Sequence, residues 1–277
     1  MKLQDLQPHI ERALTTTEPD QVDIAQQFGF IDHTTLNNTD TETSVSAFCE
    51  KVCEFNHEKY GLNALPAVCV WPRFAATASK ILKNHPTKVA CVAGAFPSGQ
   101  STLKIKLAEV AEALQNGAEE IDVVVHRGWA HEQKFDEIEN ETRALKKLCG
   151  DQPLKVILET GEFDSMPLLK KTGLAVLRGG ADFLKTSTGK SAEGATLRKS
   201  AVLMLCVKQF YEQTGNMRGI KISGGVKTCK AAAQNIALMK SVTGTAFINP
   251  DYFRIGAGSF TPVLLNALNS VQNHPWG

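Results

Sequence analysis

The sequence predicts an α/β fold, a (β/α)8 TIM barrel with an extra N-terminal helix. Eight short apolar runs alternate with longer amphipathic segments, and this repeated order of strand and helix is typical of the barrel. The expected strands cover residues 29–34, 67–71, 88–93, 120–125, 154–159, 182–186, 219–223 and 252–257. A doubly wound sheet is the competing fold, but Asp32-His33-Thr34-Thr35 stands where its GxGxxG turn would follow the first strand.

The segments between the strands are long enough for the crossover helices of a barrel. The clearest amphipathic stretches are 101–116, 131–149, 166–179 and 195–214, and an additional helix is expected at about residues 2–27. We therefore expect a single domain over residues 1–277. Its parts are a helical extension at 1–28, the barrel at 29–260, and a C-terminal helix and tail at 261–277.

The charge balance argues against a large charged partner. The 277 residues include 30 Lys and Arg and 29 Asp and Glu, a net charge of +1, which leaves no global field for nucleic acid or an anionic membrane. No apolar run is long enough to span a bilayer. The polar N-terminus carries acidic residues, unlike a secretory signal or a transit peptide. A small molecule is the expected partner.

The cysteines and histidines give little support for a metal site. The seven cysteines are odd in number and scattered along the chain, which indicates a reduced, cytoplasmic protein. Cys49 and Cys53 lie one helical turn apart with no second ligand pair nearby, so ordinary helix packing is favoured over metal binding. The seven histidines form no HxH or HExxH motif. We expect no metal.

A lysine at the end of an apolar strand is the strongest chemical signal. Lys185 follows Phe183-Leu184 and opens the small, hydroxyl-rich turn Thr186-Ser187-Thr188-Gly189-Lys190. A lysine in that position loses part of its hydration, which lowers its pKa and makes the amine a nucleophile for a carbonyl. The alternative is a lysine whose side chain reaches solvent just past the strand.

A second strand lysine favours the nucleophile. In Gly219-Ile220-Lys221-Ile222-Ser223, alternation places the two isoleucines on one face and Lys221 among small residues on the other. Two ammonium groups about 4 Å apart, at an effective dielectric constant of about 20, repel by about 4 kcal/mol, or about three pKa units. If the fold brings Lys221 close to Lys185, the second lysine lowers the pKa of the first toward neutrality.

Further polar residues are expected inside the barrel. Alternation in the run Glu120-Ile121-Asp122-Val123 separates Asp122 from its apolar neighbours, and a buried carboxylate requires a cationic partner. The same argument places Asp32, Cys69 and Lys155 on inward faces. Lys155 has a structural alternative, an ion pair with a carboxylate such as Glu159 that holds the barrel. Cys69 is expected to be a small buried hydrophobe rather than a nucleophile.

Glycine turns follow three consecutive strands. They are Gly189-Lys190, Gly224-Gly225-Val226-Lys227 and Gly256-Ala257-Gly258-Ser259. Glycines let the backbone approach an anion and expose N–H groups to it, and barrels of this kind bind phosphate after the seventh and eighth strands. Each turn alone could be a helix cap, but three in adjacent loops indicate a phosphate site.

Together these segments resemble the deoxyribose-phosphate aldolases, which are class I enzymes on a (β/α)8 barrel. The resemblance covers about residues 29–260 and is carried by segments 32–36, 68–74, 96–99, 120–124, 154–162 and 183–190. The last two read LKVILETGE and FLKTSTGK. The resemblance implies reversible cleavage of 2-deoxy-D-ribose 5-phosphate to acetaldehyde and D-glyceraldehyde 3-phosphate, without a metal or organic cofactor.

The resemblance also implies roles for single residues. Lys185 would form the Schiff base, Lys221 would lower the pKa of Lys185, and Asp122 would move protons through a bound water. Substrate contacts are implied for Asp32, Lys155, Thr188, Gly189, Lys190, Gly224, Gly225, Gly256 and Ser259. Barrels of this type often form homodimers through their outer helices, so a homodimer is also expected.

The chain departs from the family pattern at several positions. Ile222-Ser223 replaces a common proline-alanine pair, Lys227 replaces a common arginine, and Gly258 replaces the first of two serines in the eighth loop. The loss of that hydroxyl predicts weaker phosphate binding or a relaxed preference for phosphorylated substrates. No tyrosine follows Tyr252, so a C-terminal tyrosine that assists proton transfer in some members is missing.

Two other functions remain open. Another Schiff-base aldolase on the same barrel would share the two lysines and act on a different carbonyl donor, although the TSTGK turn and Asp122 favour an acetaldehyde-type donor. A barrel that only binds phosphate would keep the glycine turns but would not require two inward lysines.

Overall fold

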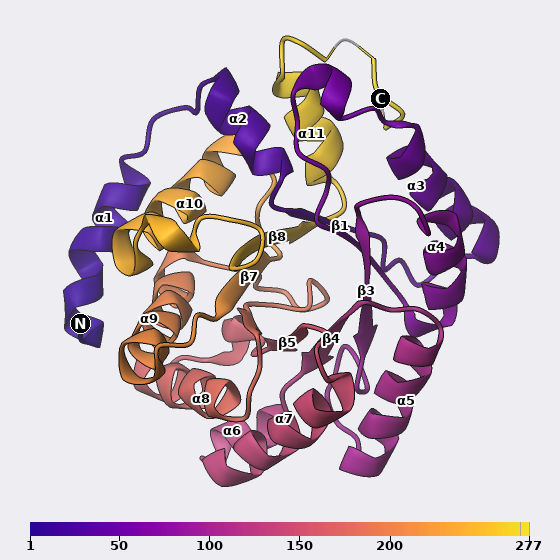
Figure 1. The fold of residues 1–277 in the computed structure, drawn as a ribbon. Coiled ribbons are helices and arrows are strands. Elements are labelled where there is room, and N and C mark those ends of the chain that lie inside the picture. Colours follow the sequence, from indigo (N-terminus) through magenta and orange to yellow (C-terminus); the bar gives the residue numbers. More distant parts are fainter. Residues whose placement is uncertain (272, 277) are drawn as a thin grey trace.

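The computed structural model describes residues 1–271 and 273–276, in which eight parallel strands close into a barrel (Figure 1). Each strand pairs with the next along the chain, and β8 returns to pair with β1. The strands are β1 Ile31–Thr34, β2 Ala67–Val70, β3 Lys88–Ala93, β4 Glu120–Val124, β5 Leu154–Ile157, β6 Phe183–Lys185, β7 Gly219–Ser223 and β8 Phe253–Ala257. The predicted barrel is confirmed, and all eight strands lie where they were expected, to within two residues at either end.

Helices surround the barrel on its outside, as Figure 1 shows. They are α3 Glu42–Glu54, α4 Ala75–Ile81, α5 Leu103–Gln115, α6 Arg127–His131, α7 Phe135–Cys149, α8 Met166–Arg178, α9 Leu197–Thr214, α10 Cys229–Thr243 and α11 Phe260–Ala267. The helix expected at 131–149 begins only at Phe135. Gln133 has a φ of 58°, a left-handed conformation that a continuous helix cannot contain, so the short α6 is separate.

The N-terminal extension is broken, whereas one helix at about 2–27 was expected. It consists of a 3₁₀ turn at Leu3–Leu6 and two α-helices, α1 Gln7–Leu14 and α2 Gln21–Phe28. Pro19 disfavours helical geometry in the residue before it, and the side chain of Asp20 accepts hydrogen bonds from the first turn of α2, as an N-cap does. The two helices pack against α10 on the outside of the barrel (Figure 1).

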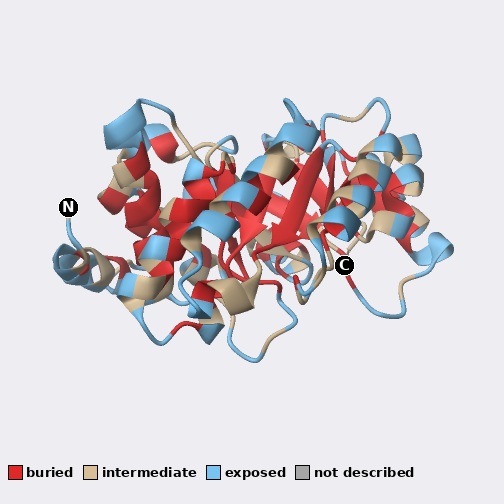
Figure 2. Cartoon of the chain, turned by 90° about the horizontal axis from the view of Figure 1, so that it is seen from below, coloured by how far each residue is buried: buried red, intermediate tan, exposed pale blue. Residues whose placement is uncertain are grey.

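The two faces of the barrel wall are buried in different surroundings. Outward residues of the strands pack with the helices into one large apolar cluster, which includes Val68, Ile121 and Ile220; in Figure 2 the visible strands are mostly red, which marks buried residues. Inward residues of β2 and β3 form a second, small cluster of Ala67, Cys69, Ala90, Val92 and nearby Leu36. The other six strands place charged side chains inside the barrel. These are Asp32, Glu120, Asp122, Lys155, Lys185, Lys221 and Arg254, each at most 4% exposed.

Candidate active site

The two strand lysines meet at one carboxylate oxygen. Lys185 closes β6 and Lys221 lies opposite it on the adjacent β7. The Nζ of Lys185 lies 2.7 Å from Oδ2 of Asp122, and the Nζ of Lys221 lies 2.9 Å from the same atom. The fold therefore brings together the three residues for which the sequence predicted chemistry.

The electrostatics distinguish the two amines. Burial lowers the pKa of Lys185, Asp122 acts in the opposite direction, and the charge of Lys221 lowers it further; the net pKa is below the ordinary lysine value. Burial also acts on Lys221, but Asp122 and Asp32 outweigh it and raise its pKa. Asp122 keeps a pKa well below its usual range despite burial, because three lysines surround it. Of the two amines, Lys185 therefore loses its proton more readily, whereas Lys221 holds its proton more firmly.

Asp32 and Lys155 lie beneath this trio and have no exposed surface. Oδ2 of Asp32 is 2.6 Å from Nζ of Lys221. The Nζ of Lys155 is 2.8 Å from Oδ1 of Asp122 and 2.6 Å from Oε2 of Glu120. Lys155 therefore pairs with carboxylates of β4 rather than with Glu159. Neither Asp32 nor Lys155 lines the pocket described next, so contact with substrate remains a prediction for both.

A pocket of about 270 Å³ opens above Lys185. It is lined by the glycine turns after β6, β7 and β8 and by the loop after β1. The lining includes Thr188, Gly189, Lys190, Gly224, Gly225, Gly256 and Ser259, together with Lys185 itself. Seven of the nine predicted substrate contacts thus surround one pocket that also holds the predicted nucleophile.

Glycine is required at particular points of this wall. Gly224 and Gly225 have φ values of 69° and 104°, which other residues adopt only with strain. A Cβ on Gly256 would lie 2.8 Å from Cε of Lys221, so the missing side chain leaves room for that lysine. A Cβ on Gly258 would lie 2.5 Å from the carbonyl oxygen of Thr34, which explains why a serine at 258 does not fit this backbone.

Two residues of the turn after β6 are held by partners. The side chain of Glu159 accepts hydrogen bonds from the backbone N–H of Thr188 and from its hydroxyl, at 3.2 and 2.5 Å. Glu159 thereby orients the turn. The ammonium group of Lys190 donates to the carbonyl oxygen of Leu36 and lies 5.7 Å from the ring centroid of Trp71.

Sequence reasoning missed Thr34 and Asn37, which also line the pocket. Lys227 and Gly258, from the glycine turns that predicted a phosphate site, line it as well, and so does Ser223, which alternation placed on the same face as Lys221. The Oγ of Ser223 is buried and has no hydrogen-bond partner among the described residues. Alternation on β7 placed Ser223 on the inward face with Lys221, but sequence reasoning gave it no role toward the substrate.

Two further missed residues, Glu120 and Arg254, lie deeper in the barrel. Arg254 donates to Oδ1 of Asp32 at 2.7 Å and to Oε1 of Glu120 at 3.1 Å. Their inward positions also follow from alternation, since Glu120 is two residues from Asp122 and Arg254 is two residues from Gly256.

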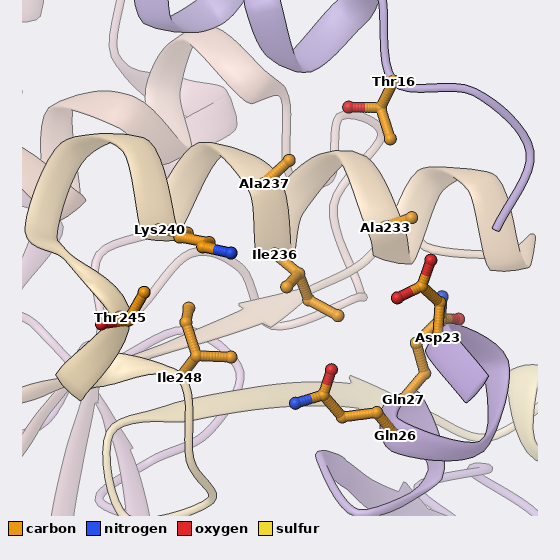
Figure 3. A pocket seen from close by; sticks show the side chains of 10 residues that line it. All are labelled: Thr16, Asp23, Gln26, Gln27, Ala233, Ile236, Ala237, Lys240, Thr245 and Ile248. Carbon is orange, nitrogen blue, oxygen red and sulfur yellow. The ribbon is translucent and has the colours of Figure 1, made fainter. Parts of the chain in front are cut away.

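A second cavity lies on the outer wall, away from the lysines. It measures about 390 Å³ and lies between α2 and α10; Figure 3 shows Asp23 and Gln26 of α2 facing Ile236 and Lys240 of α10. It contains none of the residues that the sequence singled out. Chemistry is therefore assigned to the pocket above Lys185.

The remaining predicted groups are readily located. Cys49 is buried on α3 with a pKa raised to about 12 by burial, and Cys53 is exposed on the same helix. Burial also raises the pKa of Cys69, so it is a neutral thiol at the barrel interior. Across residues 1–271 and 273–276, no cluster of three potential His, Cys, Asp or Glu ligands is present, and none of the helices has the length and apolar character to cross a membrane.

Comparison with known proteins places the chain among the aldolases. Residues 29–246 match the DeoC/LacD family aldolase domain. The chain belongs to this family. It is 37% identical to the deoxyribose-phosphate aldolase of Mus musculus over 259 residues, which cover 90% of this chain and 80% of the mouse protein. It is 36% identical over 261 residues to the Homo sapiens protein of the same name, with the same coverage.

Solved structures of DeoC-type aldolases share the fold. A putative deoxyribose-phosphate aldolase from Toxoplasma gondii is 27% identical and superposes with a TM-score of 0.78 over 91% of this chain and 96% of its own. The deoxyribose phosphate aldolase of Aeropyrum pernix, described as a tetramer, is 26% identical with a TM-score of 0.68 and covers 92% of this chain and 95% of its own. The resemblance inferred from the sequence motifs is confirmed.

Proposed function

We propose that this chain is a class I aldolase that reversibly cleaves 2-deoxy-D-ribose 5-phosphate to acetaldehyde and D-glyceraldehyde 3-phosphate. The observation that carries the proposal is a buried lysine with a lowered pKa, Lys185, at the floor of a pocket walled by glycine turns. The names of the mouse and human relatives support this choice of substrate.

In the proposed reaction the neutral Nζ of Lys185 attacks the aldehyde carbon of the open-chain sugar to give a carbinolamine, and loss of water gives an iminium ion. Removal of the proton from the C3 hydroxyl then breaks the C2–C3 bond, and its electron pair passes into the iminium to form an enamine. D-glyceraldehyde 3-phosphate leaves. Protonation of the enamine at C2 and hydrolysis release acetaldehyde and regenerate Lys185.

Asp122 and Lys221 have complementary roles in this reaction. Asp122 touches Lys185 directly, so it can hold the water that transfers protons during dehydration and at the C3 hydroxyl. Lys221 contributes a permanent positive charge next to Lys185, which disfavours protonation of the nucleophile. We assign protonation of the enamine at C2 to a water molecule held by these groups.

For the phosphate we propose the pocket formed by the three glycine turns. Backbone N–H groups near Gly189, Gly224, Gly225 and Ser259 would hold the anion. Lys227 lines the pocket and would supply a full positive charge. Lys190 would have to turn from the Leu36 carbonyl to take part.

Adduct trapping tests this proposal. After incubation with acetaldehyde and borohydride, peptide mapping by mass spectrometry should find one ethyl group on Lys185, and Lys185→Ala should lose it. Lys227→Ala is the matched control: it should keep the adduct but raise KM for the phosphorylated sugar. Labelling spread over surface lysines, or none, would leave only a phosphate-binding barrel. An adduct on Lys185 without cleavage of deoxyribose 5-phosphate would favour another Schiff-base aldolase.

The strictness for phosphate can be tested at the same site. We propose that Gly258, which removes a hydroxyl donor, relaxes the preference for phosphorylated over unphosphorylated deoxyribose. Because a Cβ at 258 would press on Thr34, Gly258→Ala is the needed control for Gly258→Ser. A ratio of KM values that changes in Gly258→Ser but not in Gly258→Ala supports the proposal; equal changes reflect strain alone.

We also propose a cytoplasmic location and assembly as a homodimer. All seven cysteines are free, and free thiols are typical of a reducing compartment. Light scattering of the purified protein tests the assembly, and a monomer or a tetramer would contradict it.

A further inference from the structure

The ions inside the barrel form a closed cycle. Going around it, Asp122 contacts Lys221, Lys221 contacts Asp32, and Asp32 contacts Arg254, at 2.9, 2.6 and 2.7 Å. The cycle returns through Glu120 and Lys155, since Arg254 lies 3.1 Å from Glu120, Glu120 lies 2.6 Å from Lys155, and Lys155 lies 2.8 Å from Asp122. Within this cycle every carboxylate bridges two cations, and every cation bridges two carboxylates. We call these six residues the ion ring.

The ion ring is electrically neutral by itself. It contains three carboxylates, whose pKa values are all lowered, and three cations, whose pKa values are all raised. Lys185 attaches to the ring at Asp122 from outside the cycle. Among the described residues, it is the fourth cation of a cluster with only three carboxylates.

We propose that Arg254 and Glu120 are positioning residues that set the protonation of Lys185 through this charge balance. The inference rests on the proposed function, because it assumes that Lys185 is the nucleophile. Arg254 pairs with both Asp32 and Glu120. The negative charges of these two carboxylates are therefore not balanced by Lys221 and Lys155 alone. With the ring complete, a proton on Lys185 gives a buried cluster a net positive charge, which burial penalises.

Other groups around Lys185 do not replace this balance. Asp122 from β4, Lys221 from β7, Lys155 from β5 and Asp32 from β1 all belong to the ring, and Cys69 from β2 is a neutral thiol. Glu159 after β5 is engaged by Thr188. The net charge of the ion ring therefore determines whether the cluster is neutral with Lys185 protonated or with Lys185 deprotonated.

Substitutions of Arg254 and of Glu120 should shift the pKa of Lys185 in opposite directions, and the double variant should cancel the two shifts. Arg254→Met leaves the ring one charge negative, so a proton on Lys185 restores neutrality and its pKa rises. Glu120→Gln leaves the ring one charge positive, and the pKa of Lys185 falls. The double variant is neutral again, and the pKa returns toward the wild-type value. A unit charge on the order of 10 Å away, at an effective dielectric constant of about 20, changes a pKa by about one unit.

The readout is the rate at which acetaldehyde and cyanoborohydride ethylate Lys185, measured by peptide mapping between about pH 5 and pH 9. Only the neutral amine reacts, so the midpoint of the acidic limb reports the pKa of Lys185. Comparing each variant with the wild type at the same pH cancels the pH dependence of the reductant. We expect about tenfold slower labelling below the midpoint for Arg254→Met, faster labelling for Glu120→Gln, and near-wild-type labelling for the double variant and for Arg254→Lys.

Lys106→Met is the matched control. Lys106 is fully buried and pairs with Glu141 at 2.7 Å between α5 and α7, outside the barrel. Its loss should lower stability without moving the midpoint.

The outcomes separate the two hypotheses. Equal midpoints in the wild type, Arg254→Met and Glu120→Gln would overturn the role of the ring, while labelling of Lys185 would still support the proposed function. If Arg254→Met fails to fold, Glu120→Gln and the double variant decide the same question, because only Glu120→Gln should be labelled faster than the wild type and the double variant should return to the wild-type rate. Absence of a wild-type adduct at Lys185 would overturn both proposals.

Discussion

Two neighbouring residues of β1 differ in charge because they lie on opposite faces of the barrel wall. Asp32 points inward, has no exposed surface and is ionised, with a pKa lowered to about 2 because Lys221 and Arg254 outweigh its burial. His33 points outward, is 2% exposed and stays neutral, with a pKa lowered to about 3 chiefly by burial. It stacks on Phe48, with ring centroids 4.3 Å apart. Burial alone therefore does not decide whether a side chain is charged; the presence of oppositely charged partners does.

The largest expected effect separates function from stability inside the barrel. Lys185→Met should lower kcat by about 10⁴-fold or more, since it removes the nucleophile. It should leave the free energy of unfolding unchanged or higher, because the ion ring is neutral without Lys185 and one buried ammonium group is removed. Enzyme assays and urea unfolding measure the two effects. A marked loss of stability would contradict the neutrality of the ring.

Lys221→Met should have the opposite stability effect. Its removal leaves Asp32 and Asp122 short of a cation within the wall, which should cost about 3–5 kcal/mol. Lys146, paired with Asp182 at 2.7 Å on the more exposed outside, is the control: Lys146→Met should cost at most about 1 kcal/mol. Equal losses in urea unfolding would show that burial of these ion pairs has no energetic consequence.

The buried neutral His33 on the outward face of β1 should make the stability of the protein depend on pH. In the unfolded chain His33 takes up a proton below its ordinary pKa of 6.5, whereas the folded chain does so only near pH 3. The unfolded state thus binds more protons in this interval, and stability falls as the pH falls, by up to about 1.4 kcal/mol per pH unit. His33→Phe should flatten this dependence between about pH 6.5 and pH 4.5, above the range in which Asp32 titrates. Parallel stability curves for the two proteins would refute the prediction.

The smallest expected effect concerns the unpaired hydroxyl of the pocket. If Ser223 donates to the sugar, Ser223→Ala should lower kcat/KM by about two- to tenfold, the range for one neutral hydrogen bond. Its stability should hardly change, since Oγ of Ser223 has no hydrogen-bond partner among the described residues. Thr186→Ser is a control for the neighbouring hydroxyl, which is already bonded to the backbone of Ser223. An unchanged kcat/KM would show that Ser223 makes no useful hydrogen bond to the substrate.

The predictable part of the molecule is the part controlled by local pattern. Period-two alternation placed Asp122 of β4 and Lys221 of β7 on inward faces, because side chains of a strand point alternately to its two faces. Glycine turns located the pocket wall after β6, β7 and β8, since close approach and positive φ are properties of the turn itself. The break in the N-terminal helix was missed, although the Pro19-Asp20 pair that causes it is equally local.

Pairing inside the barrel is a different matter. Sequence reasoning expected a cationic partner for Asp122 but proposed Glu159 as a partner for Lys155, and it did not consider Arg254 at all. In the structure Lys155 forms ion pairs with Glu120 and Asp122, and Arg254 forms ion pairs with Asp32 and Glu120. Asp32 and Arg254 are 222 residues apart in the chain and meet only because β8 pairs with β1.

The sequence by itself thus determined the barrel, its eight strands, the inward position of the lysines and the glycine turns, because each depends on residues that are neighbours along the chain. Only the tertiary structure decided which carboxylate each cation contacts, that six ions close into a neutral ring, and that Lys185 is the cation left over. Those contacts depend on closure of the sheet, which sets distances across the barrel that no local pattern contains.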